Sequence, residues 1–180
     1  MIGPRTYIVK LVDEPGALER VVGALRKRSL NIESLNVAPT ETPGRSRLTM
    51  VATRGVPRLA QHLRKSVPVL DAEDVTQEAT VLRELALLRV KAAGEREARQ
   101  VAEIAIALGG RVAAACPGSA IVEIAGHSGA IERLLVALEP FGVLELARSG
   151  PVAMVHDDAR VEEDEQIHFE IPTKIVRAHV

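Results

Sequence analysis

The chain has 180 residues, of which 47% are apolar and 2% are aromatic, and its formal net charge at pH 7 is −1. This length fits one domain or two small ones, and the apolar share is enough for a buried core. The balanced charge and the scarcity of aromatic side chains argue against binding to nucleic acid or to an anionic membrane. Cys116 is the only cysteine, so an internal disulfide is excluded, and no apolar run is long enough to span a bilayer. We therefore expect a soluble, cytoplasmic protein without a signal peptide.

Residues 1–78 alternate between strand-like and helix-like patterns in the order β-α-β-β-α-β. Apolar residues alternate in the strand-like runs and recur every three or four residues in the helix-like runs. A stretch rich in Pro, Gly and Thr at residues 39–44 predicts a hairpin between the second and third strands. In chain order we predict a strand at 6–12, a helix built on Leu18, Val21, Val22 and Leu25, strands at 31–38 and 47–53, a helix built on Val56, Leu59, Ala60 and Leu63, and a weaker strand at 67–75.

Residues 79–155 repeat the same order of elements. We therefore predict an α+β protein with two ferredoxin-like βαββαβ domains, at residues 1–78 and 79–155, joined near residues 77–80. A single larger sheet fits the pattern less well, because each half supplies a complete unit. In the second half we predict a strand at 82–92, a helix at 95–108 that stops at Gly109-Gly110, strands at 111–116 and 120–125, a helix at 128–138 and a strand at 143–147.

The pattern breaks from Pro151 onward, and residues 156–180 form an acidic tail. Acidic residues dominate 157–165, which predicts a solvated segment. Residues 167–171 have the composition of an added edge strand, and residues 172–180 are long enough to wrap a partner. A flexible tail without a specific role fits this composition equally well.

The sequence contains no arrangement of residues typical of a catalytic centre. The segment Gly126-His127-Ser128-Gly129 lacks the G-x-S-x-G spacing of a serine elbow, so we expect Ser128 to cap a helix and His127 to lie in the loop. The histidines are scattered, without the spacing of a metal site. Cys116 is expected to be a small buried residue, and no phosphate-binding loop or G-x-G-x-x-G motif occurs. The chain is therefore predicted not to be an enzyme by itself and to hold neither metal nor cofactor.

One loop, with the sequence DEPGAL from Asp13 to Leu18, has the features of a binding site. Gly16 has no Cβ, so the backbone there approaches a ligand closely. The amides of Gly16, Ala17 and Leu18 at a helix N-terminus would bind a carboxylate, and Asp13 would bind an ammonium group. An amino acid carries both groups. The alternative is that Asp13 merely caps the helix and Gly16 eases a turn.

The residues around this loop resemble a known family. LNIESLNVAPT at residues 30–40 and SRLTM at 46–50 follow the loop, and AGHSG at 125–129 and ARSG at 147–150 occur in the second half. These motifs resemble the small, regulatory subunit of acetolactate synthase (acetohydroxyacid synthase), whose first domain is an ACT domain. The resemblance covers about residues 6–155, and its 30–50 segment is more specific than a general ACT signature.

The resemblance implies a regulatory subunit that activates a separate catalytic (large) subunit and confers feedback inhibition, commonly by valine, in branched-chain amino acid biosynthesis. The catalytic partner in that family carries thiamine diphosphate, FAD and magnesium. ACT domains in the family pair side by side, which implies a homodimer with the effector at its interface. Asp13, Gly16, Ala17 and Leu18 would then bind the effector from one protomer, and Asn31 and Ile32 from the other.

The chain departs from the family at two places, Asp13 and the acidic tail beyond Asp157, which extends past the family members that the chain resembles. Several family members have Asn where this chain has Asp13, although a carboxylate still favours an ammonium group. The alternative function is a free-standing amino-acid-binding ACT protein with another target. The specific motif at residues 31–40 and the matching second domain argue against that alternative.

Overall fold

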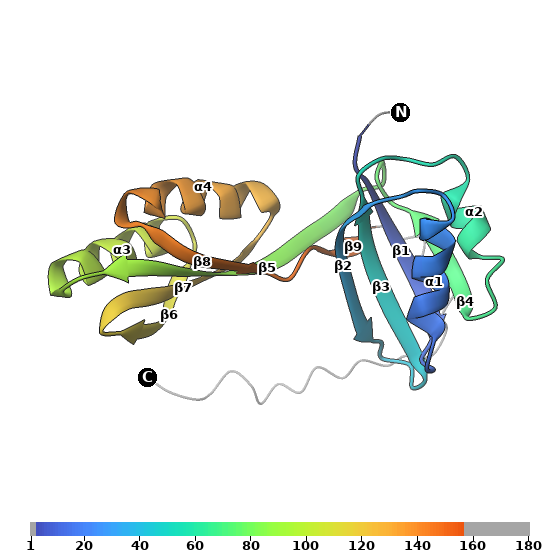
Figure 1. Cartoon of the computed structure of the whole chain (residues 1–180), viewed down its shortest axis with the longest axis horizontal. Helices are drawn as coiled ribbons and strands as arrows, with labels where there is room; N and C mark the ends of the chain where they lie inside the picture. The colour runs from blue at the N-terminus through green and yellow to red at the C-terminus, as the bar shows by residue number, and fades with distance from the viewer. Residues whose placement is uncertain (1–2, 157–180) are drawn as a thin grey trace.

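The structure is a computed structural model that describes residues 3–156, which form two antiparallel sheets (Figure 1). The first sheet has four strands in the order β2-β3-β1-β4, and two helices cover one of its faces. This N-terminal domain consists of β1 (Arg5–Val12), α1 (Ala17–Arg26), β2 (Ile32–Pro39), β3 (Arg45–Ala52), α2 (Leu59–Leu63) and β4 (Val69–Asp74).

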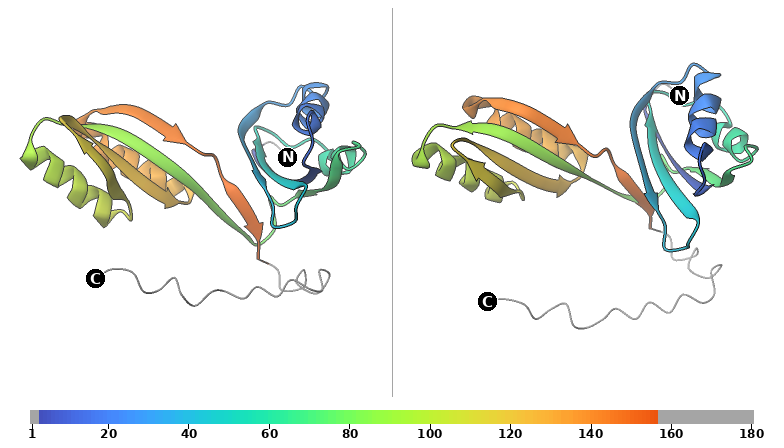
Figure 2. Two further views of the ribbon diagram at one scale, coloured as in Figure 1. Left: turned by 90° about the horizontal axis from the view of Figure 1, so that it is seen from below. Right: turned by 60° about the horizontal axis from the view of Figure 1, so that its bottom comes forward.

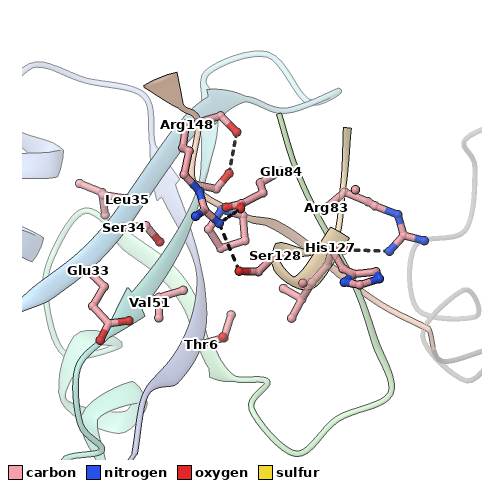
Figure 3. Close-up of a pocket in the computed structure, with 16 residues that line it drawn as sticks. Thr6, Glu33, Ser34, Leu35, Val51, Arg83, Glu84, His127, Ser128 and Arg148 are labelled. Carbon is pink, nitrogen blue, oxygen red and sulfur yellow. Dashed lines mark hydrogen bonds and ion pairs between the residues drawn. The ribbon is translucent and has the colours of Figure 1, made fainter. Parts of the chain in front are cut away.

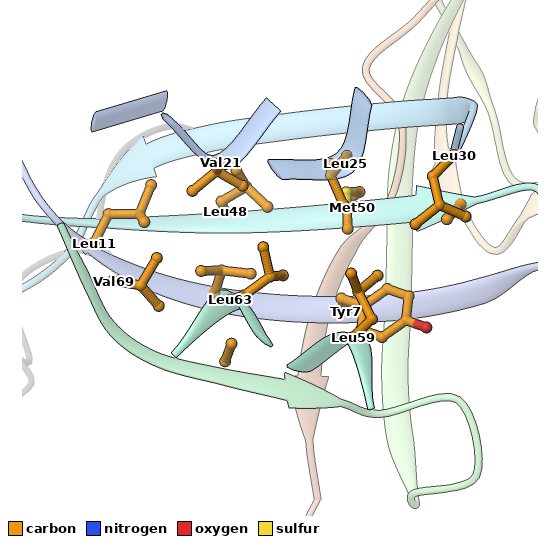
Figure 4. Packing of buried hydrophobic residues seen from close by; sticks show 13 residues of the cluster. Tyr7, Leu11, Val21, Leu25, Leu30, Leu48, Met50, Leu59, Leu63 and Val69 are labelled. Carbon is orange, nitrogen blue, oxygen red and sulfur yellow. The ribbon is translucent and has the colours of Figure 1, made fainter. Parts of the chain in front are cut away.

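The helix-facing side of this sheet forms the first hydrophobic core (Figure 4). Tyr7, Val9 and Leu11 alternate along β1 and are at most 1% exposed, because every second side chain of a strand points to the same face. Val21 and Leu25 of α1 lie one turn apart and pack onto this face. The periodicity of the sequence therefore predicted both the elements and the face that each one buries.

The second sheet repeats this arrangement, with strand order β6-β7-β5-β8 and two helices on one face. The predicted fold class, two ferredoxin-like βαββαβ domains, is confirmed. This C-terminal domain consists of β5 (Thr80–Ala92), α3 (Glu95–Ala107), β6 (Arg111–Cys116), β7 (Gly118–Gly126), α4 (Ser128–Leu138), a short 3-10 helix η1 (Glu139–Phe141) and β8 (Val143–Arg148), followed by β9 (Val152–Val155).

Buried and exposed side chains alternate along β5, and the buried ones belong to the second core. Leu88 and Val90 are fully buried against Ile131 and Leu134 of α4, whereas Leu87, on the opposite face, is 38% exposed. The second core shares no residue with the first, so each domain has its own apolar interior.

A short two-stranded ribbon joins the domains (Figure 2). The first four residues of β5 pair with β9, from Thr80 opposite Val155 to Arg83 opposite Val152. Ala153 of β9 packs with Ile8 and Val75 in a third small cluster on the outer face of the N-terminal sheet. The ribbon thus covers part of the sheet face that α1 and α2 leave open.

Two predicted elements differ from the structure. The pattern was expected to break from Pro151 onward, but residues 152–155 form β9, whose partner lies about 70 residues earlier in the chain and leaves no local signal. The second helix was expected to include Val56, but α2 has five residues and begins at Leu59. Pro57 disfavours a helical Val56, and Arg58 has a left-handed φ of 58°. The predicted tail, with its edge strand at 167–171, lies outside the described residues.

The two faces of β5 give a direct stability test. Leu88→Ala leaves a cavity in the second core and should lower the free energy of unfolding by about 2–5 kcal/mol. Leu87→Ala, one residue earlier on the exposed face, should cost less than about 1 kcal/mol. Urea denaturation of both variants measures the difference. Equal losses would contradict the burial pattern assigned to β5.

Candidate functional site

The predicted binding loop lies between β1 and α1. Gly16 is the N-cap residue of α1 and has a left-handed backbone with φ 84°. A Cβ built at this glycine would meet no atom within 4 Å, so the space above it is open. The loop therefore combines a glycine conformation with an uncovered helix N-terminus, as the binding hypothesis requires.

The backbone amides of the loop are partly used. The Ala17 amide donates to the Glu14 carbonyl at 3.2 Å, whereas no backbone bond within the described residues occupies the amides of Gly16 and Leu18. Among the described residues no side chain caps α1, so Asp13 does not cap this helix, but Gly16 does turn the chain there, as the other half of that alternative expects. The Asp13 amide instead donates to the Gly44 carbonyl at 2.8 Å, and its carboxylate is exposed at the end of β1.

Asn31 and Ile32 lie at the opposite end of the same sheet. Ile32 pairs with Ala52, which also pairs with Arg5 at the start of β1, whereas the binding loop follows the end of β1. The length of β1 separates the two groups by roughly 23 Å at about 3.3 Å per residue. Ile32 also packs partly against the first core, and Asn31 is exposed. Within one chain the structure therefore groups Asp13, Gly16, Ala17 and Leu18 but does not bring Asn31 and Ile32 to them.

Apolar side chains are exposed along this side of the domain. Leu18 and Val22 of α1 are 39% and 36% exposed, although they belong to the apolar stripe of the helix. Val37 of β2 is 40% exposed, and β2 is an edge strand of its sheet. An edge strand beside exposed apolar residues is a surface suited to pairing with another chain.

A second concave region lies between the domains (Figure 3). This interdomain cleft has a volume of about 780 Å³. Glu33, Ser34 and Val51 line it from the outer face of the N-terminal sheet, while His127 and Arg148 line it from the C-terminal domain.

Arg148 is the centre of a polar network at the edge of the interdomain cleft. Its guanidinium donates to the Glu84 carboxylate and to the Ser128 hydroxyl at 3.2 Å (Figure 3). It also donates to the Glu132 carboxylate at 2.5 Å. Burial lowers the pKa of Arg148, but the hydrogen bonds to Glu84 and Glu132 outweigh it, so the net pKa is raised. Glu84 is only 7% exposed, and Arg148 neutralises this buried carboxylate. The network joins β5, β8 and the first turn of α4.

The start of α4 corrects one local prediction, and β6 corrects another. His127, not Ser128, is the N-cap residue, and its Nδ1 accepts a hydrogen bond from the Ala130 amide at 3.2 Å. Ser128 is the first helical residue, and its hydroxyl accepts from Arg148 instead. Cys116, expected to be buried, is exposed at the end of β6 because the turn to β7 follows directly.

The described residues contain neither a metal-binding cluster nor a membrane-spanning helix. Within residues 3–156 no three side chains of His, Cys, Asp or Glu are grouped so that they would hold a metal ion. In the same part of the chain no helix combines the length and apolarity needed to cross a membrane.

Sequence reasoning missed four residues of the interdomain region: Ser34, Glu84, Arg148 and Gly150. One of them carried a signal, since Glu84 falls on the buried face of an otherwise apolar alternating strand and therefore required a cationic partner. Ser34, Arg148 and Gly150 carried no local signal for their roles, because these depend on contacts between distant segments.

Two family models match the chain, one in each domain. Residues 8–71 match the model described as AHAS small subunit-like ACT domain, and residues 83–157 match the small subunit of acetolactate synthase. The matched segments correspond to the two sheets.

Curated and solved relatives agree with these models. The chain is 36% identical to a probable acetolactate synthase small subunit of Methanothermobacter thermautotrophicus, over 84% of this chain and 93% of that protein. It is 35% identical to the acetolactate synthase small subunit of Bacillus subtilis, over 83% and 88%. The crystal structure of the acetolactate synthase small subunit of Thermotoga maritima superposes with a TM-score of 0.73 at 29% identity, over 87% and 99%. The chain therefore belongs to the family of acetolactate synthase small subunits, the non-catalytic part of that enzyme.

Proposed function

We propose that this chain associates with the acetolactate synthase catalytic subunit in the cytoplasm, activates it and makes it sensitive to valine. The observation that carries the proposal is the open N-terminus of α1, where Gly16 exposes free amides beside the Asp13 carboxylate. Thiamine diphosphate, FAD and magnesium belong to the catalytic subunit in this proposal. The chain itself acts by binding an amino acid and shifting an equilibrium between active and inhibited complexes.

The chemistry of the loop suits an α-amino acid. The amides of Gly16 and Leu18 have no backbone acceptor among the described residues and would bind the carboxylate of the ligand, aided by the helix dipole. The exposed Asp13 carboxylate would bind the ammonium group. Leu18, which is 39% exposed beside these groups, would contact an isopropyl side chain. These features favour an aliphatic amino acid over an acidic one.

The same proposal requires a homodimer. Asn31 and Ile32 lie at the far end of the sheet from the loop, so they reach an effector only in a second copy that runs in the opposite direction. Antiparallel pairing of two β2 edges across a two-fold axis would satisfy this requirement, since it places opposite ends of the two sheets together. It would also cover Val22 and Val37.

The alternative is a free-standing amino-acid-binding protein with another target. Family membership in both domains favours the subunit over this alternative. Co-purification distinguishes the two, because the subunit should retain a thiamine-diphosphate enzyme.

Reconstitution tests the function. Adding this chain to the catalytic subunit of the same organism should raise the rate of acetolactate formation from pyruvate, and valine should return the rate toward the basal level. The catalytic subunit alone should not respond to valine. Absence of activation would favour the free-standing protein. Activation without a valine response would retain the subunit and assign a different effector.

Gly16→Asp tests the effector loop. The new carboxylate would occupy the position of the ligand's carboxylate and repel it, so the affinity for valine should fall at least tenfold, or about 1.4 kcal/mol. Gly109→Asp is the matched control, since Gly109 has the same φ of 84° and equally open surroundings but follows α3. Calorimetric titration with valine measures both variants. Unchanged affinity in Gly16→Asp would remove this residue from the site.

Val37→Glu tests the homodimer. A charged side chain at the exposed β2 edge should repel its symmetry mate and raise the dimer dissociation constant by about tenfold or more. Val136→Glu, on the exposed face of α4 where Val136 is 66% exposed, should leave the dimer intact. Sedimentation over a concentration series measures both. If both variants weaken the dimer equally, or if neither does, the interface does not lie at the β2 edge.

A further inference from the structure

A β-bulge places Ser34 on the outer face of the N-terminal sheet. Ile32 pairs with Ala52, but Ser34 pairs with Val51, so the register shifts between them. Without the bulge Ile32 and Ser34 would share one face, because side chains alternate along a strand. With it, Ile32 and Leu35 pack toward the first core, and Ser34 lines the interdomain cleft (Figure 3).

Gly150, in the connection between β8 and β9, lies directly on Ser34. Gly150 is buried and has a left-handed φ of 72°. A Cβ at this position would lie 2.9 Å from the Ser34 Cβ and 3.4 Å from the Ser34 Oγ, with the Leu35 amide nitrogen at 4.0 Å. The two segments are therefore too close for any side chain but hydrogen at position 150. The buried Ser34 Oγ has no hydrogen-bond partner among the described residues, so the contact is steric rather than polar.

Hydrogen bonds hold the Gly150 segment firmly to the C-terminal domain. The preceding residue, Ser149, donates its amide to the Leu85 carbonyl at 3.0 Å and accepts from the Leu85 amide on its hydroxyl at 3.0 Å. Its hydroxyl also donates to the Gly150 carbonyl at 2.7 Å. Arg148, one residue further back, holds β8 to Glu84 and α4. A displacement of Gly150 is therefore transmitted to β5 and α4.

On its other side, Gly150 leads into β9, which is fixed to the N-terminal sheet. Ala153 is fully buried there, and its carbonyl accepts a hydrogen bond from Arg47 at 2.5 Å. Burial lowers the pKa of Arg47. Beside the ribbon and the Ser34 contact lies the open cleft of about 780 Å³ between the domains. A tilt of the C-terminal domain that pressed Gly150 onto Ser34 would be limited by this contact.

We propose that Ser34 and Gly150 form the coupling contact through which β2 sets the position of the C-terminal domain. The inference builds on the proposed function, since Asn31 and Ile32, the residues expected to contact the effector, immediately precede the bulge that orients Ser34. An effector that moves the start of β2 moves Ser34, and Gly150 follows because no space separates them. Ser34 and Gly150 are positioning residues and contact no effector.

Gly150→Ala tests the coupling contact in the complex with the catalytic subunit. The methyl group should force the domains apart, so valine binding measured by calorimetry should stay within about twofold of the parent, whereas most of the inhibition reached at saturating valine should be lost. Gly109→Ala is the matched control, because it introduces an alanine at a left-handed φ with nothing within 4 Å. It should change neither quantity.

A second variant separates lost coupling from misfolding. Ser34→Gly removes both side-chain atoms that a Cβ at residue 150 would meet within 3.4 Å. The double variant Gly150→Ala with Ser34→Gly should therefore recover inhibition by valine. Failure of this rescue, or normal inhibition in Gly150→Ala alone, would overturn the proposal.

A distance measurement does not depend on valine or on the catalytic subunit. Cys116 is the only cysteine and is exposed, so a spin label there and one at Arg26→Cys on α1 report the distance between the domains. The labelled chain is diluted with unlabelled Cys116→Ser chain to suppress pairs between protomers. Gly150→Ala should shift the distance distribution, the double variant should restore it, and Gly109→Ala should leave it unchanged. An unshifted distribution in Gly150→Ala would overturn the proposal.

The distance and inhibition measurements together distinguish the effector assignment from the coupling role of the Ser34–Gly150 contact. If the distance shifts but the parent complex does not respond to valine, the effector assignment fails while the positioning role of the contact stands. If the distance shifts while the inhibition at saturating valine stays unchanged, the contact is structural only and the coupling role is overturned.

Discussion

The arrangement of the molecule depends on the continuous pairing of β5. Residues 80–83 of this strand pair with β9 against the outer face of the N-terminal sheet, and residues 84–92 pair with β7 inside the second sheet. A hydrogen-bonded ribbon bends less readily than an unpaired linker, so the two cores are joined by a stiff connection. This ribbon lies beside the cleft, and the close approach of Gly150 to Ser34 is a second restraint on how the two domains are placed.

A buried ion pair fixes the end of β8 within the C-terminal domain. Glu84 occupies a core-facing position of β5, where an unpaired carboxylate would be strongly destabilising. Arg148 compensates it and simultaneously bonds Glu132 and Ser128 of α4. Because all these bonds converge on one guanidinium two residues before Gly150, the end of β8 is fixed to both its sheet and its helix. A restraint applied at Gly150 therefore acts on the whole domain rather than on a loose connection.

Strand β2 presents three different surfaces. Ile32 and Leu35 face the first core, Ser34 faces the cleft, and the free edge near Val37 is open to a second chain. The bulge between Ile32 and Ser34 makes this division possible, since it changes which face each following side chain occupies. In the proposed function the same strand would therefore carry the effector contact, the homodimer edge and the contact with the C-terminal domain.

The amino-acid sequence by itself determined the elements and the family. The signals are local patterns: apolar residues that alternate in β1 and β5, the apolar stripe of α1, and the glycine at the α1 N-terminus. They predict structure directly because strands and helices have fixed side-chain periods. The sequence motifs also identified the small-subunit family. Tertiary structure alone decided the pairing of β9, the partner of Glu84 and the contact of Gly150 with Ser34. It also decided that His127 caps α4 while the Ser128 hydroxyl accepts from Arg148. Each of these joins or depends on segments far apart in the chain, and register between distant segments is set by packing rather than by periodicity.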